Sequence, residues 1–387
     1  MAGIVIPKVT DVNVTIDIDH PQSTVGLTNP NLFVKGDKEG YGEYTTIEDV
    51  MADYPMGTPA YNAAYAVFAQ PNAPELVAIT SYVKDNSGSL TAAAPTPEDL
   101  ESTPTADGAE ITESESPTTA TGDVDWTKLT GVAKAAADYF YRNWEFALMP
   151  EYDEEDALYL ATLIEKGGYD GKGFHLFFPQ VSDFTKENPF KDFHRTWCFY
   201  HTDADEYYTA ALVGKGGAKT VGSISWKFVS DLVDITPESL PITDMQTIDK
   251  NGYIAYYTKG ANSNQTTDAN PLGDFIDTYH GADWIKSETE TQLQNLLNNS
   301  GKLTFDKAGV AKIEQVLRTI LNQATSQTII DTDDDTGDGI FNLTVKQRAD
   351  LRKADIAKRL YKGAFFDYQP SGAINHINVG ITQDALA

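Results

Sequence analysis

Two segments, one near each end of the chain, alternate apolar and polar residues with the two-residue period of a β-strand. Their apolar positions are Val12, Val14, Ile16, Ile18, Ile377, Val379 and Ile381. A strand with an unpaired edge leaves backbone N–H and C=O groups open, so each segment needs a partner sheet. We predict two extended arms that pair with neighbouring copies. The other interpretation of the first segment is an ordinary first strand of the protein's own domain.

Between the ends, short apolar strands alternate with amphipathic helices. Thr58 and Pro59 form a favourable helix start, because Thr caps free backbone N–H groups and Pro lacks one. Strands are predicted over 32–34, 76–83, 146–149, 174–178, 196–200 and 253–257, and helices over 59–68, 133–141, 157–166 and 207–213. Gly167 and Gly168 are expected to end the third helix with a left-handed cap. This order predicts a mixed α/β (α+β) fold with helix-covered sheets.

The last third of the chain is mainly helical before it becomes basic. One predicted helix carries Trp284 and Leu297, and Asp306 caps another with a clear apolar stripe. A strand is predicted over 340–345. Thr344 is then expected to cap a helix from residue 346, whereas residues 357–366 also fit an alternating strand.

Residues 86–122 have a different composition from the rest. They contain seven acidic residues and four prolines, and no Lys, Arg or aromatic residue. Such a segment buries too little apolar surface to offset the entropy of ordering it. We predict an acidic insertion or linker, with a small strand-rich outer domain as the alternative.

These patterns predict a multi-domain subunit. The expected units are an N-terminal β arm over 1–20, a small α/β unit over 21–85, the insertion over 86–122, an α/β middle region over 123–250, a C-terminal assembly domain over 251–370 and a C-terminal β arm over 371–387.

The charge of the chain is unevenly distributed. The net charge is −28, yet residues 346–362, which we call the basic window, carry +5, so the remainder carries −33. The basic residues are Lys346, Arg348, Arg352, Lys353, Lys358, Arg359 and Lys362. So acidic a chain repels nucleic acid, which is bound through many Lys and Arg contacts to phosphate. No secretory signal or membrane-spanning apolar stretch is visible, so we expect a soluble protein made in a cytoplasm, with no membrane partner.

The sequence signals for a catalytic, phosphate-binding or metal site are weak. Cys198 lies near His201, but the predicted strand sends them to opposite faces, so a buried structural cysteine is favoured over a nucleophile. Residues 214–220 end like a phosphate loop but lack its glycines, which favours a helix end and turn. Asp331, Asp333 and Asp335 are spaced like calcium ligands, but half of that ligand set is missing, which favours a solvated acidic turn. We expect neither a cofactor nor an enzyme.

Four weak motifs occur in an order that resembles the sheath proteins of contractile phage tails. Residues 222–228 (GSISWKF) resemble a strand of that family, and residues 279–286 (YHGADWIK) resemble a helix start. Residues 303–310 (LTFDKAGV) resemble the turn into the next helix, and residues 372–377 (GAINHI) resemble the closing strand, with Asn375 as an extra residue before the histidine. In the first motif Ser225 stands where the family has threonine. The resemblance spans roughly residues 125–387; the N-terminal third matches only in outline, and the insertion has no counterpart.

The resemblance implies a structural protein of a virion, assembled in the host cytoplasm. Subunits of this family form hexameric rings stacked around a tail tube, and their arms add strands to neighbouring C-terminal domains. Contraction then drives the tube through the host envelope for genome ejection. The implied partners are further copies, the tail tube protein, and baseplate and tail terminator proteins. The basic window fits a contact with an acidic tube, or else a helix that neutralises the protein's own acidic face.

Other classes remain open from the residues alone. A secreted or surface adhesion module could use the insertion as a stalk, although no signal peptide is visible. Another self-assembling virion protein, such as a tail tube or capsid protein, would polymerise too. The interpretation as an enzyme is supported only by Cys198 and the turn over 214–220.

Overall fold

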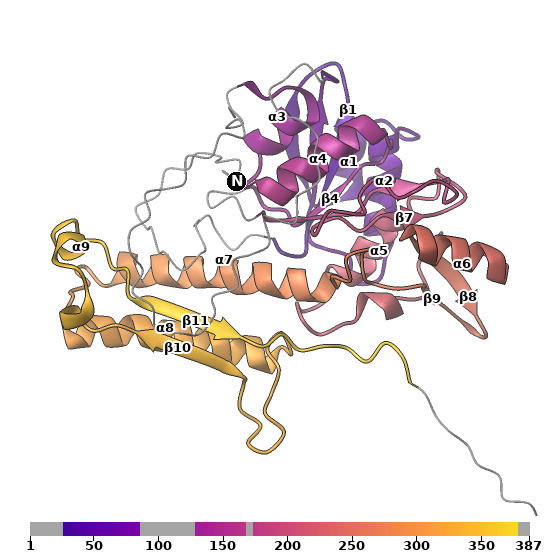
Figure 1. Ribbon diagram of the computed structural model, residues 1–387. Helices are drawn as coiled ribbons and strands as arrows, with labels where there is room; N and C mark the ends of the chain where they lie inside the picture. Colours follow the sequence, from indigo (N-terminus) through magenta and orange to yellow (C-terminus); the bar gives the residue numbers. More distant parts are fainter. Residues whose placement is uncertain (1–25, 86–127, 168–172, 378–387) are drawn as a thin grey trace, which may run out of the picture.

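The computed structural model describes residues 26–85, 128–167 and 173–377 (Figure 1). The N-terminal arm, the acidic insertion, and Val379 and Ile381 of the C-terminal arm lie outside these residues. Of the predicted arm positions, only Ile377 is described. It is 80% exposed and belongs to no strand within the described chain.

A mixed sheet forms the body. Its strands are β1 (Pro30–Lys35), β2 (Gly40–Tyr44), β3 (Val77–Tyr82), β4 (Phe146–Leu148) and β5 (Leu176–Phe177), in the order β2-β3-β1-β4-β5. β1 runs parallel to β3 and β4, and β2 pairs antiparallel with β3 at the edge. The central strands are buried on both faces, which is why they are continuous apolar runs in the sequence.

A second ladder continues this sheet. It joins β6 (Gln180–Val181), β7 (Phe199–Tyr200), β8 (Ile254–Lys259) and β9 (Asn262–Gln265) in chain order. Only two residues separate β5 from β6; Phe177 of β5 pairs with Thr196, just before β7, and β6 pairs with β7 itself. The Phe177 N–H donates to the Arg195 carbonyl (2.9 Å) and the Phe199 N–H donates to the Pro179 carbonyl (2.9 Å). The two ladders therefore form one bent surface.

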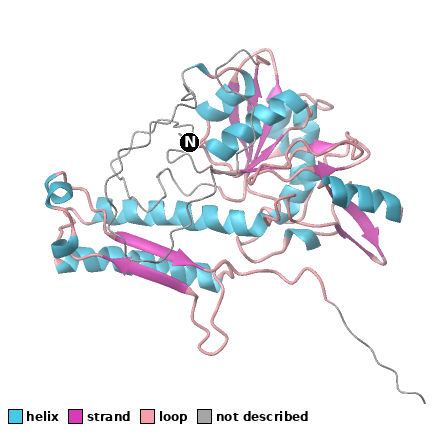
Figure 2. Cartoon of the chain, in the orientation of Figure 1, coloured by secondary structure: helices cyan, strands magenta, loops and turns pink. Residues whose placement is uncertain are grey.

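Helices cover both faces of the body, as the alternating pattern predicts (Figures 1 and 2). α3 (Gly131–Asp138) and α4 (Glu154–Lys166) enclose one buried apolar cluster, and α1 (Ile47–Asp53), α2 (Pro59–Phe68) and α5 (Tyr208–Gly216) enclose the other. The Tyr61 N–H donates to the Thr58 hydroxyl, so the predicted cap of α2 is confirmed. α6 (Ile242–Asn251) lies beside β8.

The C-terminal part projects from this body. We call residues 276–368, from the start of α7 to the end of β11, the lever. α7 (Ile276–Asn299) leaves the sheet, α8 (Lys307–Ser326) returns along it, and the hairpin β10 (Phe341–Val345) and β11 (Ala364–Tyr368) lies on these helices (Figure 1). Asp306 caps α8 as predicted, since its Oδ1 accepts the Gly309 N–H at 2.8 Å. α7 is 24 residues long, so it extends about 36 Å at 1.5 Å per residue.

Three local expectations are wrong. Thr344 lies within β10 and caps no helix; the basic window instead holds two short turns, η4 (Arg348–Asp350) and α9 (Lys353–Ala357), before β11 begins at Ala364. Residues 222–228 form a loop ending in the turn η3 (Trp226–Phe228), not a strand. Gly167 ends α4 in an extended conformation (φ −72°) rather than a left-handed one.

A buried ion pair joins the lever to the body. Arg195, on the segment before β7, donates to both carboxylate oxygens of Asp283 in α7 (Nη1–Oδ2 2.6 Å, Nη2–Oδ1 3.1 Å). Asp283 is 1% exposed and Arg195 is 8% exposed. The planar, two-point contact fixes orientation as well as distance, so it sets the angle at which α7 leaves the sheet.

Two further contacts hold the first turns of α7. The buried His280 ring meets the Leu27 carbonyl oxygen (Nε2–O 2.6 Å). Burial lowers the pKa of His280 to about 4, so the ring is neutral and donates this bond. Trp197 Nε1 donates to the Asp274 carbonyl just before α7 (2.9 Å). The base of the lever is therefore tied to the sheet at several points.

Glu145 lies fully buried behind the ion pair, and neither of its oxygens meets a hydrogen-bond donor. Burial, reinforced by the nearby Asp283 carboxylate, raises the pKa of Glu145 well above the ordinary carboxyl value, while Arg195 opposes the shift. His175 Nδ1 lies 3.8 Å from Glu145 Oε2, and burial lowers the pKa of His175, so that ring is neutral. Burial and the neighbouring carboxylate thus favour the protonated form of Glu145.

We predict that Asp283→Ala lowers the free energy of unfolding by about 3–5 kcal/mol, because it leaves the Arg195 charge buried without its partner. Urea unfolding measures this. The double variant Arg195→Met/Asp283→Leu should recover most of the loss, since it removes both charges. Glu314→Ala breaks the exposed pair with Arg318 (3.2 Å) and should cost no more than about 0.5 kcal/mol. A small loss for Asp283→Ala would contradict the structural role of the pair.

We predict that Glu145→Gln raises the urea midpoint at pH 8 and leaves it nearly unchanged at pH 4. A carboxyl group whose folded pKa is raised stabilises the fold while protonated, and this stabilisation is lost as the pH rises through the folded value. Glutamine keeps the neutral form at every pH. Glu75→Gln, at an exposed position, is the control. Equal midpoints of wild type and Glu145→Gln across this range would show that Glu145 is not held neutral.

Candidate assembly surfaces

The hairpin β10–β11 presents two open strand edges. Among the described residues it forms a sheet of only two strands, antiparallel, with Leu343 opposite Phe366. Such a sheet is marginally stable alone, and here α8 supports one face through Leu343, Phe366 and Leu317. The opposite face carries Asn342 and Asp367, joined by a side-chain hydrogen bond of 2.7 Å.

The pairing register shows which backbone groups lie on the open edges. The Lys346 N–H donates to Gly363 and the Gln369 N–H donates to Ile340, so these two pairs are hydrogen-bonded pairs. Because hydrogen-bonded and non-bonded pairs alternate along an antiparallel ladder, the backbone groups of residues 343 and 345 on one strand, and 364, 366 and 368 on the other, face away from the hairpin. Both edges can therefore accept another strand.

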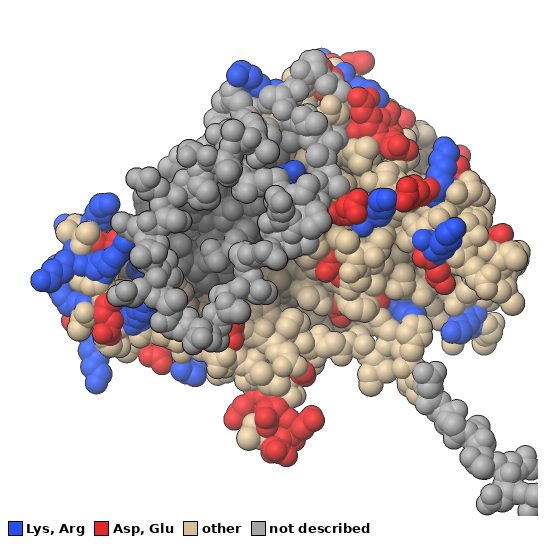
Figure 3. Space-filling model, in the orientation of Figure 1, with Lys and Arg blue, Asp and Glu red and all other residues tan. Residues whose placement is uncertain are grey.

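The basic window forms one end of the hairpin. Its Lys and Arg side chains gather at the α9 end of the lever, at the left of Figure 3. Arg352 pairs with Asp355 within the window (Nε–Oδ2 2.8 Å), which lowers the pKa of Asp355. Among the described residues, no carboxylate lies within 4.0 Å of the side-chain nitrogens of the other six basic residues, Lys346, Arg348, Lys353, Lys358, Arg359 and Lys362. A concentrated positive surface therefore remains available to a partner.

The predicted acidic turn lies at the opposite end of the hairpin, where residues 331–339 form a projecting loop (Figure 3). Asp333 Oδ1 accepts the N–H groups of Asp335 (3.0 Å) and Thr336 (2.9 Å), and Asp331 Oδ2 accepts from Gln369 Nε2 (3.1 Å). Within the described ranges, no group of carboxylate, His or Cys side chains is placed to hold a metal ion. The three aspartates close the loop rather than converge on one point.

Two of the motifs that resemble the sheath family meet in space, which sequence reasoning missed. Asn375, near the C-terminus, donates to Asp268 Oδ1 (2.7 Å), and Ser225 Oγ lies 3.0 Å from Asp268 Oδ2. Lys227 Nζ lies 3.1 Å from His376 Nε2. We call this group of residues the terminal clip. Asp268 belongs to no motif, and nothing in its sequence neighbourhood identifies it.

The residues considered for catalysis are buried or hydrogen-bonded to other groups. Cys198 is buried, as predicted, and burial raises the pKa of its thiol. In the described chain no hydrogen bond joins it to a histidine: His194 contacts Asp274 (Nδ1–Oδ2 2.7 Å) and His201 contacts the carbonyls of Asp203 and Thr236. These positions give no nucleophile and base in contact.

The glycines of residues 214–220 serve close packing. A Cβ atom at Gly214 would lie 2.6 Å from the Val67 carbonyl oxygen, and one at Gly216 would lie 2.9 Å from the Trp226 ring. α5 can therefore contact both α2 and Trp226. The helix ends at Gly216, three residues beyond the predicted range of 207–213, and a turn follows. The structure thus supports a helix end rather than a phosphate loop.

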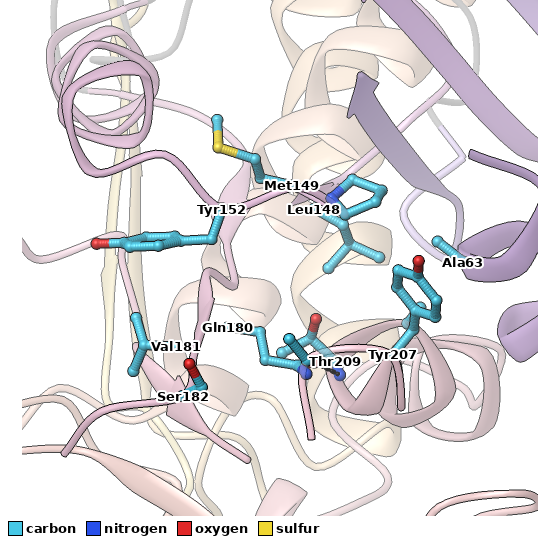
Figure 4. A pocket seen from close by; sticks show the side chains of 12 residues that line it. Ala63, Leu148, Met149, Tyr152, Gln180, Val181, Ser182, Tyr207 and Thr209 are labelled. Atoms are coloured by element: carbon cyan, nitrogen blue, oxygen red, sulfur yellow. Dashed lines mark hydrogen bonds between the residues drawn. The ribbon is translucent and has the colours of Figure 1, made fainter. Parts of the chain in front are cut away.

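A pocket of about 180 Å³ lies at the carboxyl ends of β4 and β6, where α/β proteins often bind ligands. Tyr152 and Tyr207 line it from different sides (Figure 4). Gln180 beside it is already used, since its side chain donates to the Glu206 carbonyl and accepts the Thr209 N–H. Among the described residues, no Asp, Glu, Lys, Arg or His side chain lines this pocket.

The described part of the chain contains no helix that is both long and apolar enough to cross a membrane. Its longest helix, α7, carries several charged residues.

Comparison with known proteins supports the fold. No family model matches the sequence, and no curated protein matches it in sequence. In structure, the chain is similar to a chain of the anti-feeding prophage (AFP) baseplate, with 11% identity and a TM-score of 0.62 over 98% of this chain and 100% of that one. It is also similar to a chain of the AFP helical sheath in the contracted state (10% identity, TM-score 0.56, 98% of both chains).

A third similar structure is a chain of the AFP baseplate in the contracted state (13% identity, TM-score 0.56, 97% of both chains). The match extends over nearly the whole length of each chain. The mixed α/β architecture predicted for a sheath-like subunit is therefore confirmed, and the fold is one found in a contractile sheath assembly.

Proposed function

We propose that this chain is a structural subunit of a contractile tail sheath, which polymerises around a tube and contracts to drive the tube through a target envelope. The observation that carries the proposal is a lever, joined to the body by a buried ion pair, whose hairpin has two strand edges without a partner strand among the described residues. The fold shared with a sheath assembly supports it.

Strand addition is the mechanism of assembly in this proposal. A two-stranded sheet with one supported face gains from each added strand, because main-chain hydrogen bonds supply affinity and alternating side chains supply register. The alternating segments at residues 12–19 and 377–382 have the pattern that such an edge accepts. The arm residues Val12, Val14, Ile16, Ile18, Ile377, Val379 and Ile381 are therefore proposed to pair with the hairpins of neighbouring copies.

The basic window is proposed to face the tube. It lies at the far end of the lever from the acidic body, and the ion pair that Arg352 makes with Asp355 lies inside the window. A helix that neutralises the protein's own acidic face is the weaker interpretation, because the window is not a single helix and pairs mainly within itself. Screened contacts of this kind hold a partner yet can exchange during sliding.

The remaining details follow the same proposal. Hexameric rings, a phage particle as the location, assembly in the host cytoplasm, and contacts with baseplate and tail terminator proteins are parts of it. No enzymatic step is required, since the work comes from the difference in free energy between two arrangements of the polymer. An adhesion module would leave the open edges of the hairpin without a purpose.

We predict that deleting residues 1–18 leaves a folded monomer that cannot polymerise. The deletion removes the alternating arm and none of the described body or lever. Circular dichroism and sedimentation measure folding and size, and negative-stain microscopy detects polymers. A deletion of equal length within the insertion, residues 98–115, is the control and should still polymerise. Normal polymers from the arm deletion would contradict strand exchange through this arm.

We predict that charge reversal at Lys346, Arg348, Arg352 and Lys353 reduces binding to the tube about tenfold or more at roughly 0.15 M salt. The difference should shrink at 1 M salt, where the screening length falls to about 3 Å. Co-sedimentation of the purified protein with its tube measures binding. Reversal at Lys38, Lys186, Lys219 and Lys250, exposed on the body, makes the same change in net charge and is the control. Equal loss in both variants would assign the effect to net charge rather than to this surface.

A further inference from the structure

The last described residues cross from the hairpin back to the body and are held there at only two points. The Ser371 N–H donates to the Ile329 carbonyl (3.0 Å), where the chain leaves the hairpin. The next contact is the terminal clip at Asn375 and His376. Between them, a Cβ atom at Gly372 would meet nothing within 4 Å, and Ile374 is 77% exposed.

The body side of the terminal clip is a preformed polar receptor. Asp268 is 1% exposed, and its Oδ2 also accepts the Lys227 N–H (3.2 Å). Ser225 Oγ lies within hydrogen-bond distance of Asn375 Oδ1 (3.1 Å), and Lys227 Nζ lies 3.4 Å from the Asn375 carbonyl oxygen. Receptor and tail are thus complementary in hydrogen bonding.

The tail side of the terminal clip contributes no apolar anchor. Ile374 and Ile377, which flank Asn375 and His376, are 77% and 80% exposed. Hydrogen bonds without hydrophobic burial exchange for hydrogen bonds to water at small net cost. The contact is therefore specific in geometry and depends on a few hydrogen bonds.

We propose that the terminal clip is a releasable anchor that sets where the C-terminal arm leaves its subunit, and that its opening lets the arm follow a second copy of this chain as the copies move apart. This inference rests on the proposed function. The predicted arm strand begins at Ile377, directly after the clip. With the clip closed, the partner edge must lie beside the body of the same subunit.

Opening the terminal clip releases a defined length of chain. From Ser371, which stays bound to the hairpin, to Ile377 there are six steps along the chain. At about 3.3–3.6 Å per residue, they span at most about 22 Å. With the clip open, Ile377 can reach points within about this distance of Ser371, and the arm can follow a neighbouring copy within that reach.

The first test follows the tail in the monomer. Ile377→Cys accepts a spin label, and the native Cys198 is 1% exposed and does not compete for it. With the clip intact, the electron paramagnetic resonance spectrum should show a restricted label. Asn375→Ala should shorten the rotational correlation time at least about threefold, and Ile374→Ala, at an exposed position in the same segment, should not. Equal spectra for Asn375→Ala and Ile374→Ala would overturn the clip.

Asp268→Asn is a second variant, with circular dichroism to confirm folding. It keeps the shape of the receptor but weakens its acceptor for Asn375, so it should also release the label. A folded Asp268→Asn protein with a restricted label would overturn the assignment of Asp268 as the receptor.

The second test uses the polymer. Asn375→Ala should still polymerise but with less uniform spacing between copies, seen as weakened layer lines in electron micrographs, because nothing fixes where the arm departs. Uniform polymers identical to wild type would overturn the role of the clip in spacing. The wild-type protein could form no polymer while Asn375→Ala still releases the label. That result would contradict the proposed function but would leave the terminal clip supported.

Discussion

The bidentate pair between Arg195 and Asp283 is the constraint on which the rest of the structure depends. It is buried at the point where the lever leaves the sheet, so it fixes the direction of α7. Removing two charges from water is costly, and this cost is met only when the two-point geometry forms. A misdirected lever would leave both charges unpaired. The pair therefore selects one arrangement of body and lever.

That arrangement has a consequence for assembly. The hairpin runs along a helix about 36 Å long, from the buried cluster at the base of α7 to the basic window at the far end, and within the described chain its two outer edges have no partner strand. The subunit itself resists bending, because the base of α7 is held by Asp283, His280 and the Asp274 carbonyl. In the proposed polymer, movement between copies would fall to residues 371–377, whose contacts with the body in the described chain are hydrogen bonds.

The sequence predicted the parts of the fold that depend on neighbouring residues. The cap at Thr58, the cap at Asp306 and the apolar strand over 32–34 are local signals, and the structure confirms each. The turns over 348–357 were missed, because Lys and Arg favour helices and the pairing of β10 with β11 overrides that preference. The pairing of these two strands could not be predicted from the composition of the segment.

The joint and the terminal clip could not be predicted for the same reason. Arg195 and Asp283 are 88 residues apart, and Asn375 and Asp268 are 107 residues apart. Nothing in either local pattern marks a partner. A cryo-electron microscopy map of the polymer tests the central claim most directly. The account predicts strands from neighbouring copies hydrogen-bonded to the outer edges of β10 and β11; a polymer whose hairpins remain two-stranded would contradict it.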